Sequence, residues 1–345
     1  MNAELINRRK VALGLAGASL AGCATTPPLL INFADLPPPL AKSGDEDTAR
    51  AAAGADLAGR LTVPVLIEGR GPYPFVVDTG ANRTVVSQEL AGELGLIDAG
   101  PADIHGIAGI EPSRTVIIRR IEIDTVSAAN LRAPTLPASR LGAAGLLGVD
   151  MMIGRLVTLD FRRGELRIAR SRGDPTPSAF NMRQASTGSQ RQVAAARGVV
   201  ASARYRFGQL VIVGADVQGR RIMAFLDSGS QSTVGNLALR DRMNASGRDL
   251  RGPRYDVRLL SATGQTASGE YGVLPLLRLG GLDISGLGAV FSDLHVFDLW
   301  DLSREPSVLI GIDVMRQFDA IELDYGGRRI VFYPGVERLG RGGRP

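Results

Sequence analysis

A four-part pattern occurs twice in this chain: an apolar run with strand-like alternation, an aspartate, a small hydroxyl residue and a glycine. The copies are FVVDTGANRT at residues 75–84 and AFLDSGSQST at residues 224–233, so Asp227 follows Asp78 by 149 residues. An acid group that is to activate water has to project from a rigid strand, and a glycine admits another backbone segment where a Cβ would collide. One copy alone is common in turns, but two copies in matching contexts indicate that the aspartates act as a pair.

The residues beside each aspartate are candidates for supporting the two loops. The hydroxyl groups of Thr79 and Ser228 can bond across to the other copy and lock the loops together. Gly80 and Gly229 allow the loops to approach closely.

Further matching segments show that one topology is written twice. Each aspartate is followed by a helix-like segment, then by an apolar-apolar-Gly motif, and then by a strand-like segment with an aspartate, an aromatic residue and a turn. The matching pairs are residues 87–96 with 237–243, Gly148 with Gly311, and 159–164 with 323–328. Internal repetition of this kind defines the architecture of a chain before any local detail does.

Two other aspartates lie close to these motifs. Asp150 and Asp313 follow the glycines of the apolar-apolar-Gly motifs and precede short helix-like runs. Aspartate is a favoured residue at helix starts, so we expect both to cap helices and not to take part in catalysis.

With these motifs, the chain resembles the retropepsin-like and pepsin-like aspartic proteases, and more closely the bacterial single-chain forms with two retropepsin-like repeats. The resemblance spans roughly residues 60 to 333. It implies an all-β fold of two β-barrel lobes with short helices, related by a pseudo-twofold axis. It also implies that strands bearing Gly148 and Gly311 cross beneath the loops of Asp78 and Asp227.

Composition changes along the chain predict the domain boundaries. Proline-rich and charged residues mark a tether before the first repeat, and a segment rich in Ser, Thr, Gln, Arg and Pro separates the repeats. The predicted parts are a signal peptide at 1–22, a tether at 23–58, an N-terminal lobe at 59–170, a linker at 171–197, a C-terminal lobe at 198–334 and a disordered tail at 335–345.

The N-terminal segment is typical of an export signal. A basic start at residues 8–10 precedes an apolar run at residues 11–21, which is too short to span a bilayer. The run ends in Leu-Ala-Gly-Cys and resembles a bacterial lipoprotein signal, which implies lipidation at Cys23 and anchoring to the periplasmic face of the outer membrane. An ordinary cleaved signal with a chance cysteine is the alternative, and the paired arginines leave Sec and twin-arginine export both open.

Composition limits the other classes of function. With 345 residues and 44% apolar content, the chain can form two cores, and its net charge of +5 is spread out. We therefore expect no nucleic-acid partner. The single cysteine excludes a disulfide within the chain and a thiolate metal site, and with only two histidines we also expect no histidine-built zinc site. We therefore predict no metal and no cofactor.

The family resemblance also implies a glycine-rich hairpin, or flap, that follows each aspartate and covers bound substrate. The two candidates are residues 104–109 and 261–266. Glycines in such hairpins permit tight turns and motion, although both segments can also be ordinary surface turns. The flap residues predicted from these segments are His105, Gly106, Gly109, Thr263 and Gly264, with His105 as a candidate substrate contact.

If the repeats face one another, Asp78 and Asp227 come within hydrogen-bonding distance. Two carboxyl groups so close share one proton, because two like charges repel. The ionised member can then take a proton from water while the protonated member polarises a carbonyl group. Ser230 follows the second motif where the first has Ala81, so we expect its hydroxyl to donate to Asp227, leaving the charge more often on Asp227 and the proton on Asp78.

These observations predict an envelope aspartic endopeptidase that acts on extended polypeptide, functions as a monomer with two lobes and is held at the membrane by its lipidated N-terminus. A cleft between two such lobes can bind a strand through its backbone. The alternative is a catalytically inactive lipoprotein that binds a peptide or partner in the same cleft.

Overall fold

The computed structural model describes residues 48–56, 58–172, 198–245 and 251–335. The predicted signal peptide, Cys23, most of the tether, linker residues 173–197 and nearly all of the tail lie outside these ranges. The described part is mostly β-strand with a few short helices, so the all-β prediction is confirmed. None of its helices is long and apolar enough to cross a membrane.

The first repeat forms an eight-stranded sheet in the order β2-β3-β4-β9-β5-β8-β7-β6. An additional pairing of β3 with β7 closes the strands between them into a barrel. The elements are β2 (Gly54–Ala55), β3 (Leu61–Ile67), β4 (Arg70–Val77), β5 (Val85–Ser87), α1 (Gln88–Leu94), β6 (Ile97–Gly106), β7 (Gly109–Ile123), β8 (Val126–Leu136), α2 (Ala138–Leu141) and β9 (Gly145–Leu147).

The second repeat follows the same plan. Strand β16 pairs in parallel with β21, and β17 pairs with β21 in the antiparallel direction, as β4 and β5 do with β9. The elements are β13 (Gln209–Ile212), β14 (Asp216–Val217), β15 (Arg220–Arg221), β16 (Met223–Leu226), β17 (Val234–Gly235), α5 (Leu237–Ala245), β18 (Arg251–Leu260), β19 (Thr266–Leu279), β20 (Leu282–Phe291), α6 (His295–Leu299), β21 (Ser307–Ile310) and α7 (Ile312–Met315).

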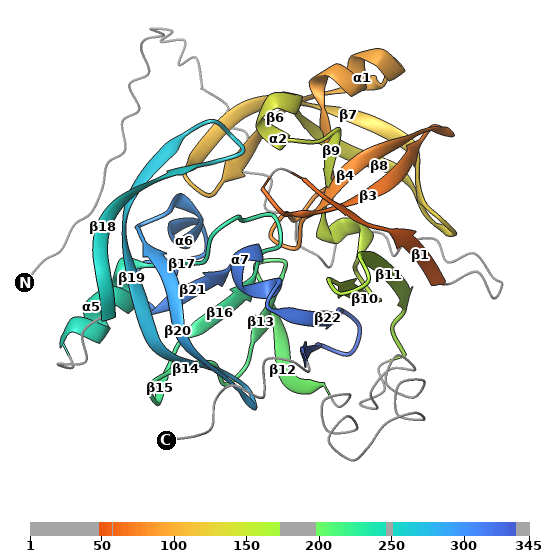
Figure 1. Ribbon diagram of the computed structural model, residues 1–345. Helices are drawn as coiled ribbons and strands as arrows, with labels where there is room; N and C mark the ends of the chain where they lie inside the picture. The colour runs from red at the N-terminus through yellow and green to blue at the C-terminus, as the bar shows by residue number, and fades with distance from the viewer. Residues whose placement is uncertain (1–47, 57, 173–197, 246–250, 336–345) are drawn as a thin grey trace, which may run out of the picture. The chain divides into compact units, whose positions relative to one another are not determined.

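A run of six strands joins the two repeats, in the order β1-β11-β10-β22-β23-β12. At its centre β10 of the first repeat pairs antiparallel with β22 of the second, with Leu156 opposite Asp324 (Figure 1). The strands are β1 (Thr48–Ala52), β10 (Arg155–Asp160), β11 (Glu165–Arg170), β12 (Val199–Arg206), β22 (Phe318–Asp324) and β23 (Arg329–Pro334).

Strand β1 corrects the predicted extent of the tether. It lies inside the segment assigned to the tether, residues 23–58, but pairs along its whole length with β11. Its side chains alternate between exposed and buried, and Ala49 and Ala51 enter the core. A short alanine strand of this kind carries no strong signal in the sequence, because alanine has low β propensity.

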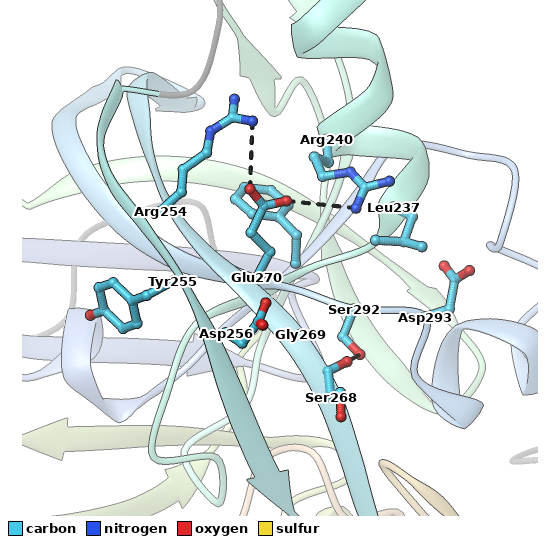
Figure 2. Close-up of a pocket in the computed structure, with 11 residues that line it drawn as sticks. Leu237, Arg240, Arg254, Tyr255, Asp256, Ser268, Gly269, Glu270, Ser292 and Asp293 are labelled. Atoms are coloured by element: carbon cyan, nitrogen blue, oxygen red, sulfur yellow. Dashed lines mark hydrogen bonds and ion pairs between the residues drawn. The ribbon is translucent and has the colours of Figure 1, made fainter.

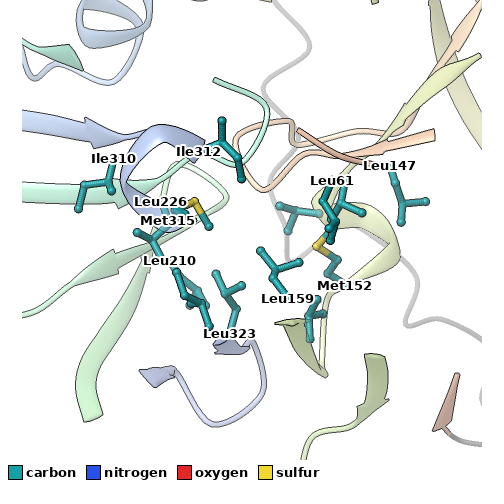
Figure 3. Packing of buried hydrophobic residues seen from close by; sticks show 14 of the residues in the cluster. Leu61, Leu147, Met152, Leu159, Leu210, Leu226, Ile310, Ile312, Met315 and Leu323 are labelled. Carbon is teal, nitrogen blue, oxygen red and sulfur yellow. The ribbon is translucent and has the colours of Figure 1, made fainter. Parts of the chain in front are cut away.

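The core is built from the alternating faces of these strands. In β3 the side chains of Leu61, Val63, Val65 and Ile67 are buried and those between them are less so, which is the pattern of a strand with one face inward. Figure 3 shows leucine, isoleucine and methionine side chains from both repeats in one cluster, including Leu61 and Leu210. Each fully buried side chain of this size contributes about 1.5–3 kcal/mol to folding.

Helix α1 (Gln88–Leu94) lies within the helix-like segment predicted at residues 87–96. Its N-cap Ser87 accepts a hydrogen bond from the N–H group of Leu90, at 3.0 Å. Gly95 ends it in the left-handed conformation with φ of 62°, which glycine adopts at little cost.

Candidate active site

Each aspartate is set at the end of a strand by a second strand beside it. The backbone N–H of Asp78, just after β4, donates to the carbonyl of Leu147 in β9 at 3.0 Å. In the second repeat the N–H of Asp227, just after β16, donates to Ile310 in β21 at 2.9 Å. The strands that carry the apolar-apolar-Gly motifs therefore fix the backbone positions of Asp78 and Asp227.

The two aspartates lie together in a buried position. Each carboxyl group lies against the glycine of the other loop, and the residues are 9% and 7% exposed. The N–H groups of Gly80 and Ala81 donate to Asp78 Oδ1 at 2.9 and 3.0 Å, and those of Gly229 and Ser230 donate to Asp227 Oδ1 at 3.1 Å. The backbone of each loop thus orients its own carboxyl group.

The glycine of each motif lies against the aspartate of the other repeat. A Cβ atom placed on Gly80 would lie 2.4 Å from the carboxyl carbon of Asp227, and one on Gly229 would lie 2.3 Å from that of Asp78. Both distances are well inside van der Waals contact. Any side chain at either glycine would therefore displace the opposite carboxyl group.

The hydroxyl groups of Thr79 and Ser228 connect the two loops reciprocally. The N–H of Thr79 donates to Ser228 Oγ, and the N–H of Ser228 donates to Thr79 Oγ1, both at 3.0 Å. Each hydroxyl also donates to a carbonyl on the opposite strand, Thr79 to Leu226 at 2.8 Å and Ser228 to Val77 at 2.7 Å. These four buried bonds hold the aspartates at a fixed separation.

The expectation that Asp150 and Asp313 cap helices is wrong. The N-cap residue of the short 3₁₀ helix Val149–Met151 is Gly148, and that of α7 is Gly311. Neither helix has a side-chain hydrogen bond at its cap. Asp150 instead accepts from the hydroxyl of Thr84 at 2.7 Å and from its N–H at 2.9 Å, and Asp313 binds the equivalent Thr233 in the same way. Each carboxylate thereby fastens the end of an active-site loop to the strand that crosses beneath it.

Burial dominates the titration of the pair. Burial raises the pKa of Asp78, against the loop N–H groups and the positive charge of Arg60. Burial and then the negative charge of Asp78 raise the pKa of Asp227 to about 7, against the N–H groups of Ser230 and Gly229. The charge therefore favours Asp78 and the proton favours Asp227.

This placement reverses the sequence-based expectation, which depended on Ser230. The hydroxyl of Ser230 donates to the carbonyl of Ser232 at 2.9 Å, so only its backbone N–H reaches Asp227. Ala81 supplies the same backbone bond to Asp78 at 3.0 Å. The serine hydroxyl therefore gives Asp227 no advantage, whereas the positive charge of Arg60 is among the effects that lower the pKa of Asp78.

Sequence reasoning missed two residues that flank the site. Arg60 and Gln209 each precede an aspartate by 18 residues, so they are equivalent positions of the repeat. Gln209 Nε2 donates to the carbonyl of Gly80 at 3.1 Å and to Asn82 Oδ1 at 2.6 Å. Arg60, with 9% exposure, is paired with Asp56 at 2.7 Å. Aligning the two repeats on their aspartates would have identified the pair.

Both predicted flap segments are the tips of long hairpins, and the two tips meet. The β6–β7 hairpin turns between Gly106 and Gly109, and the β18–β19 hairpin turns at residues 261–265. A Cβ on Gly106 would lie 2.3 Å from Thr263 Oγ1, and Gln265 Nε2 donates to the carbonyl of Ile110 at 2.9 Å. Gly264 has φ of +83°, which the tight second turn requires.

Each hairpin tip also packs on the opposite repeat. Ile107 of the first hairpin packs against the apolar cluster of the second repeat that includes Phe225 and Trp300. Ala262 of the second hairpin packs against the cluster of the first repeat that includes Val76 and Leu141. The ring of His105, the candidate substrate contact, lies against His295 of α6.

Comparison with known families gives two matches in tandem. Residues 63–153 match the family described as gag-polyprotein putative aspartyl protease, and residues 213–314 match the family described as aspartyl protease. Each match contains one aspartate motif and one apolar-apolar-Gly motif. The chain belongs to the retropepsin-like aspartic protease family and carries two repeats. No curated protein matches it.

In this two-repeat aspartic protease, the buried hydroxyl of Ser228 provides a test of how the loops are held. Ser228→Ala is expected to lower the free energy of unfolding by about 1–3 kcal/mol, because it leaves buried partners on Thr79 and Val77 without a hydrogen bond. Urea unfolding followed by fluorescence measures the change. Ser228→Thr, which restores the hydroxyl found in the first copy, is the matched control, and equal losses in both variants would contradict the prediction.

Proposed function

We propose that this protein is an aspartic-type endopeptidase that hydrolyses peptide bonds with a water molecule activated between Asp78 and Asp227. The observation that carries the proposal is the buried pair of carboxyl groups, each held by N–H groups of its own loop and lying against the glycine of the other, with a pKa of about 7 on Asp227. Both aspartate motifs are intact. Family membership supports a protease-like function.

The charge placement assigns a role to each aspartate. Asp78, favoured as the ionised member, takes a proton from water, while Asp227, favoured as the protonated member, donates to the oxygen of the scissile carbonyl. Water then adds to the carbonyl carbon. When the resulting tetrahedral species collapses, the C–N bond breaks, the leaving nitrogen takes a proton from Asp78, and Asp227 takes back a proton from a hydroxyl of the species. Because water is the nucleophile, no covalent enzyme intermediate forms.

The proposed substrate is an extended polypeptide. The hairpins offer backbone groups, and the two tips meet across the repeats, so a strand lying between them and the aspartates can pair with backbone from both repeats. We further propose that the protein acts in the bacterial envelope, lipid-anchored through Cys23. That part of the proposal rests on the signal-like sequence of residues 1–23, which lie outside the described ranges.

A peptide-library experiment tests the activity. The purified protein is incubated with a diverse peptide library from about pH 4 to about pH 7.5, spanning the ordinary range of aspartate and histidine, beside an Asp78→Asn variant. We expect mass spectrometry to detect cleavage products with the first protein and not with the second. Binding of peptides without cleavage by either protein would favour the alternative of an inactive peptide-binding lipoprotein.

The raised pKa of Asp227 predicts the basic limb of the pH–rate profile. Below about pH 7 the pair holds the single shared proton; as the pH rises through about 7 that proton is lost and the group that polarises the carbonyl disappears. We therefore expect kcat to fall above about pH 7. A profile of kcat from steady-state hydrolysis measures it, and a kcat that stays constant well beyond that pH would count against the assignment.

A further inference from the structure

The first hairpin is attached to the second repeat by two histidines that lie far apart in the sequence. His105 is near the end of β6 and His295 begins α6, and their Nδ1 and Nε2 atoms are 3.0 Å apart. Their rings are stacked, with centroids 5.2 Å apart and an angle of 16° between the planes. They are the two histidines of the chain. Beside them the N–H of Val296 donates to the carbonyl of Ile107 at 3.4 Å.

The surroundings of His105 determine which protonation state this contact allows. Its Nε2 atom is buried and has no hydrogen-bond partner in the described part of the chain. A charged imidazole carries a proton on both nitrogens, so charging His105 would bury an unsatisfied N–H group. The arrangement without this penalty has Nδ1–H of His105 donating to Nε2 of a neutral His295.

Protonation of His295 disturbs this arrangement as well. The Nε2 atom of His295 then carries a proton and can only donate. The contact survives only if Nδ1 of His105 accepts, and the proton of a neutral His105 then lies on its buried Nε2 atom. Protonation of both rings places two donors face to face. Burial and then the charge of His295 lower the pKa of His105, against an opposing effect of Asp103.

The carboxylates on the packed elements are turned to other partners or lie apart from the pair. On β7, Glu111 is paired with Arg140 of α2. On α6, Asp298 accepts from Ser303. Asp293, just before α6, lines the pocket beside the second hairpin (Figure 2). Among the described residues, neither these carboxylates nor Asp103 on β6 accept a hydrogen bond from either ring, so none of the four forms a charge-assisted hydrogen bond with a protonated histidine.

Other described contacts of the hairpins are made by an amide and by ion pairs, without histidine. Gln265 donates to the carbonyl of Ile110, and the base of the second hairpin is held by Glu270, which pairs with Arg240 at 3.7 Å and with Arg254 at 3.5 Å. Figure 2 shows these ion pairs at the edge of a pocket of about 510 Å³.

We propose that His105 and His295 are positioning residues that hold the first hairpin closed over the aspartates at neutral pH and release it in mild acid. The consequence for catalysis rests on the proposed function, but the opening itself does not. The open hairpin binds more protons than the closed one, so closure weakens as the pH falls through the ordinary histidine pKa of about 6.5. The change is at most about tenfold per pH unit for each proton taken up.

Hydrogen exchange of the full-length protein tests the opening. Protection of the backbone of residues 104–110 is measured by mass spectrometry at about pH 7.5 and about pH 5.5, on either side of the histidine pKa, and corrected for the intrinsic rate. We expect protection of this segment to fall at least about fivefold in acid, within that linkage limit, while β22 in the shared sheet is unchanged. Unchanged protection of residues 104–110 would overturn the proposal.

Two variants separate titration from simple loosening. His105→Asn combined with His295→Gln places amide groups where Nδ1 and Nε2 meet, so a hydrogen bond is kept but nothing titrates, and we expect equal protection at both pH values. Gln265→Ala removes a non-titrating contact of the same hairpin and is expected to lower protection equally at both. If the double variant keeps the pH dependence of the wild type, the histidines are not its source.

A kinetic measurement links the hairpin to substrate binding. In the wild type we expect KM to change between the two pH values with the state of the hairpin, whereas in the double variant it stays constant. The basic limb of kcat, which belongs to the aspartates, is expected to be the same in both. If no peptide is cleaved, the proposed function fails, but hydrogen exchange still decides whether the histidines control the hairpin.

Discussion

Replacing Asp227 by Asn is expected to reduce peptide hydrolysis by about 10²–10⁴-fold, the usual contribution of a positioned acid–base group. The amide keeps the shape of the side chain and can still accept from the N–H groups of Gly229 and Ser230. It cannot hold the proton that the pair shares. Single-turnover hydrolysis of a peptide found in the library experiment measures the loss, and Asp78→Asn is expected to be equally damaging because the two groups act as a unit.

The stability of the same variant distinguishes a chemical defect from misfolding. Burial raises the pKa of Asp227 to about 7, so the folded protein binds a proton that the unfolded chain releases near pH 4, and folding becomes less favourable as the pH rises between these values. Asn removes that cost. We therefore expect Asp227→Asn to raise Tm at about pH 8 and to change it little at about pH 4. An inactive variant with a lowered Tm at both pH values would mean that the loop, not the proton, had been lost.

Adding one methyl group at Gly229 is expected to cost nearly as much activity as removing an aspartate. The Cβ atom of Gly229→Ala would lie 2.3 Å from the carboxyl carbon of Asp78, and the N–H groups of Gly80 and Ala81 hold that carboxyl group in place. Overpacking of this kind costs about 1–3 kcal/mol of stability. A shift of about 1 Å in a reacting group can cost about 100-fold in rate. Hydrolysis and thermal unfolding of the same sample measure both effects.

A matched glycine provides the control. Gly92 lies in α1, and a Cβ atom placed there would have no neighbour within 4 Å. Gly92→Ala is therefore expected to leave hydrolysis unchanged and to stabilise the helix by about 0.5–1 kcal/mol. Activity in Gly229→Ala equal to that of Gly92→Ala would show that the loops are looser than the structure indicates.

The repeated motifs carry enough information to predict the fold class and the pairing of the loops. Apolar runs that end in Asp78 and Asp227 predict strands, and the same order of segments in both halves predicts the same topology. These predictions succeed because each depends on local strand pattern and on symmetry. Strand β1 is not predicted in this way. The buried positions of its short run TARAA are alanines, which do not distinguish a strand from a tether.

Side-chain partners are less predictable, because they depend on which rotamer the fold leaves free. Ser230 has the right chemistry to serve Asp227, yet the loop turns its hydroxyl to Ser232. Asp150 lies near the start of a short helix, as a capping residue would, yet it is Gly148 that occupies the N-cap and Asp150 accepts from Thr84. His105 is in the predicted flap, and the residues next to it in the sequence give no indication that it contacts His295, 190 residues away. Such contacts follow from tertiary packing and not from sequence spacing.

The antiparallel pairing of β10 with β22 has a consequence for how the site survives dilution. An active centre assembled from two separate subunits dissolves when the subunits are scarce, because its formation depends on their concentration. Here one polypeptide supplies both halves, and β10 and β22 join them in a single sheet. The effective concentration of Asp78 relative to Asp227 is therefore independent of the protein concentration. The centre is therefore complete in every folded molecule, however few of them a cell contains.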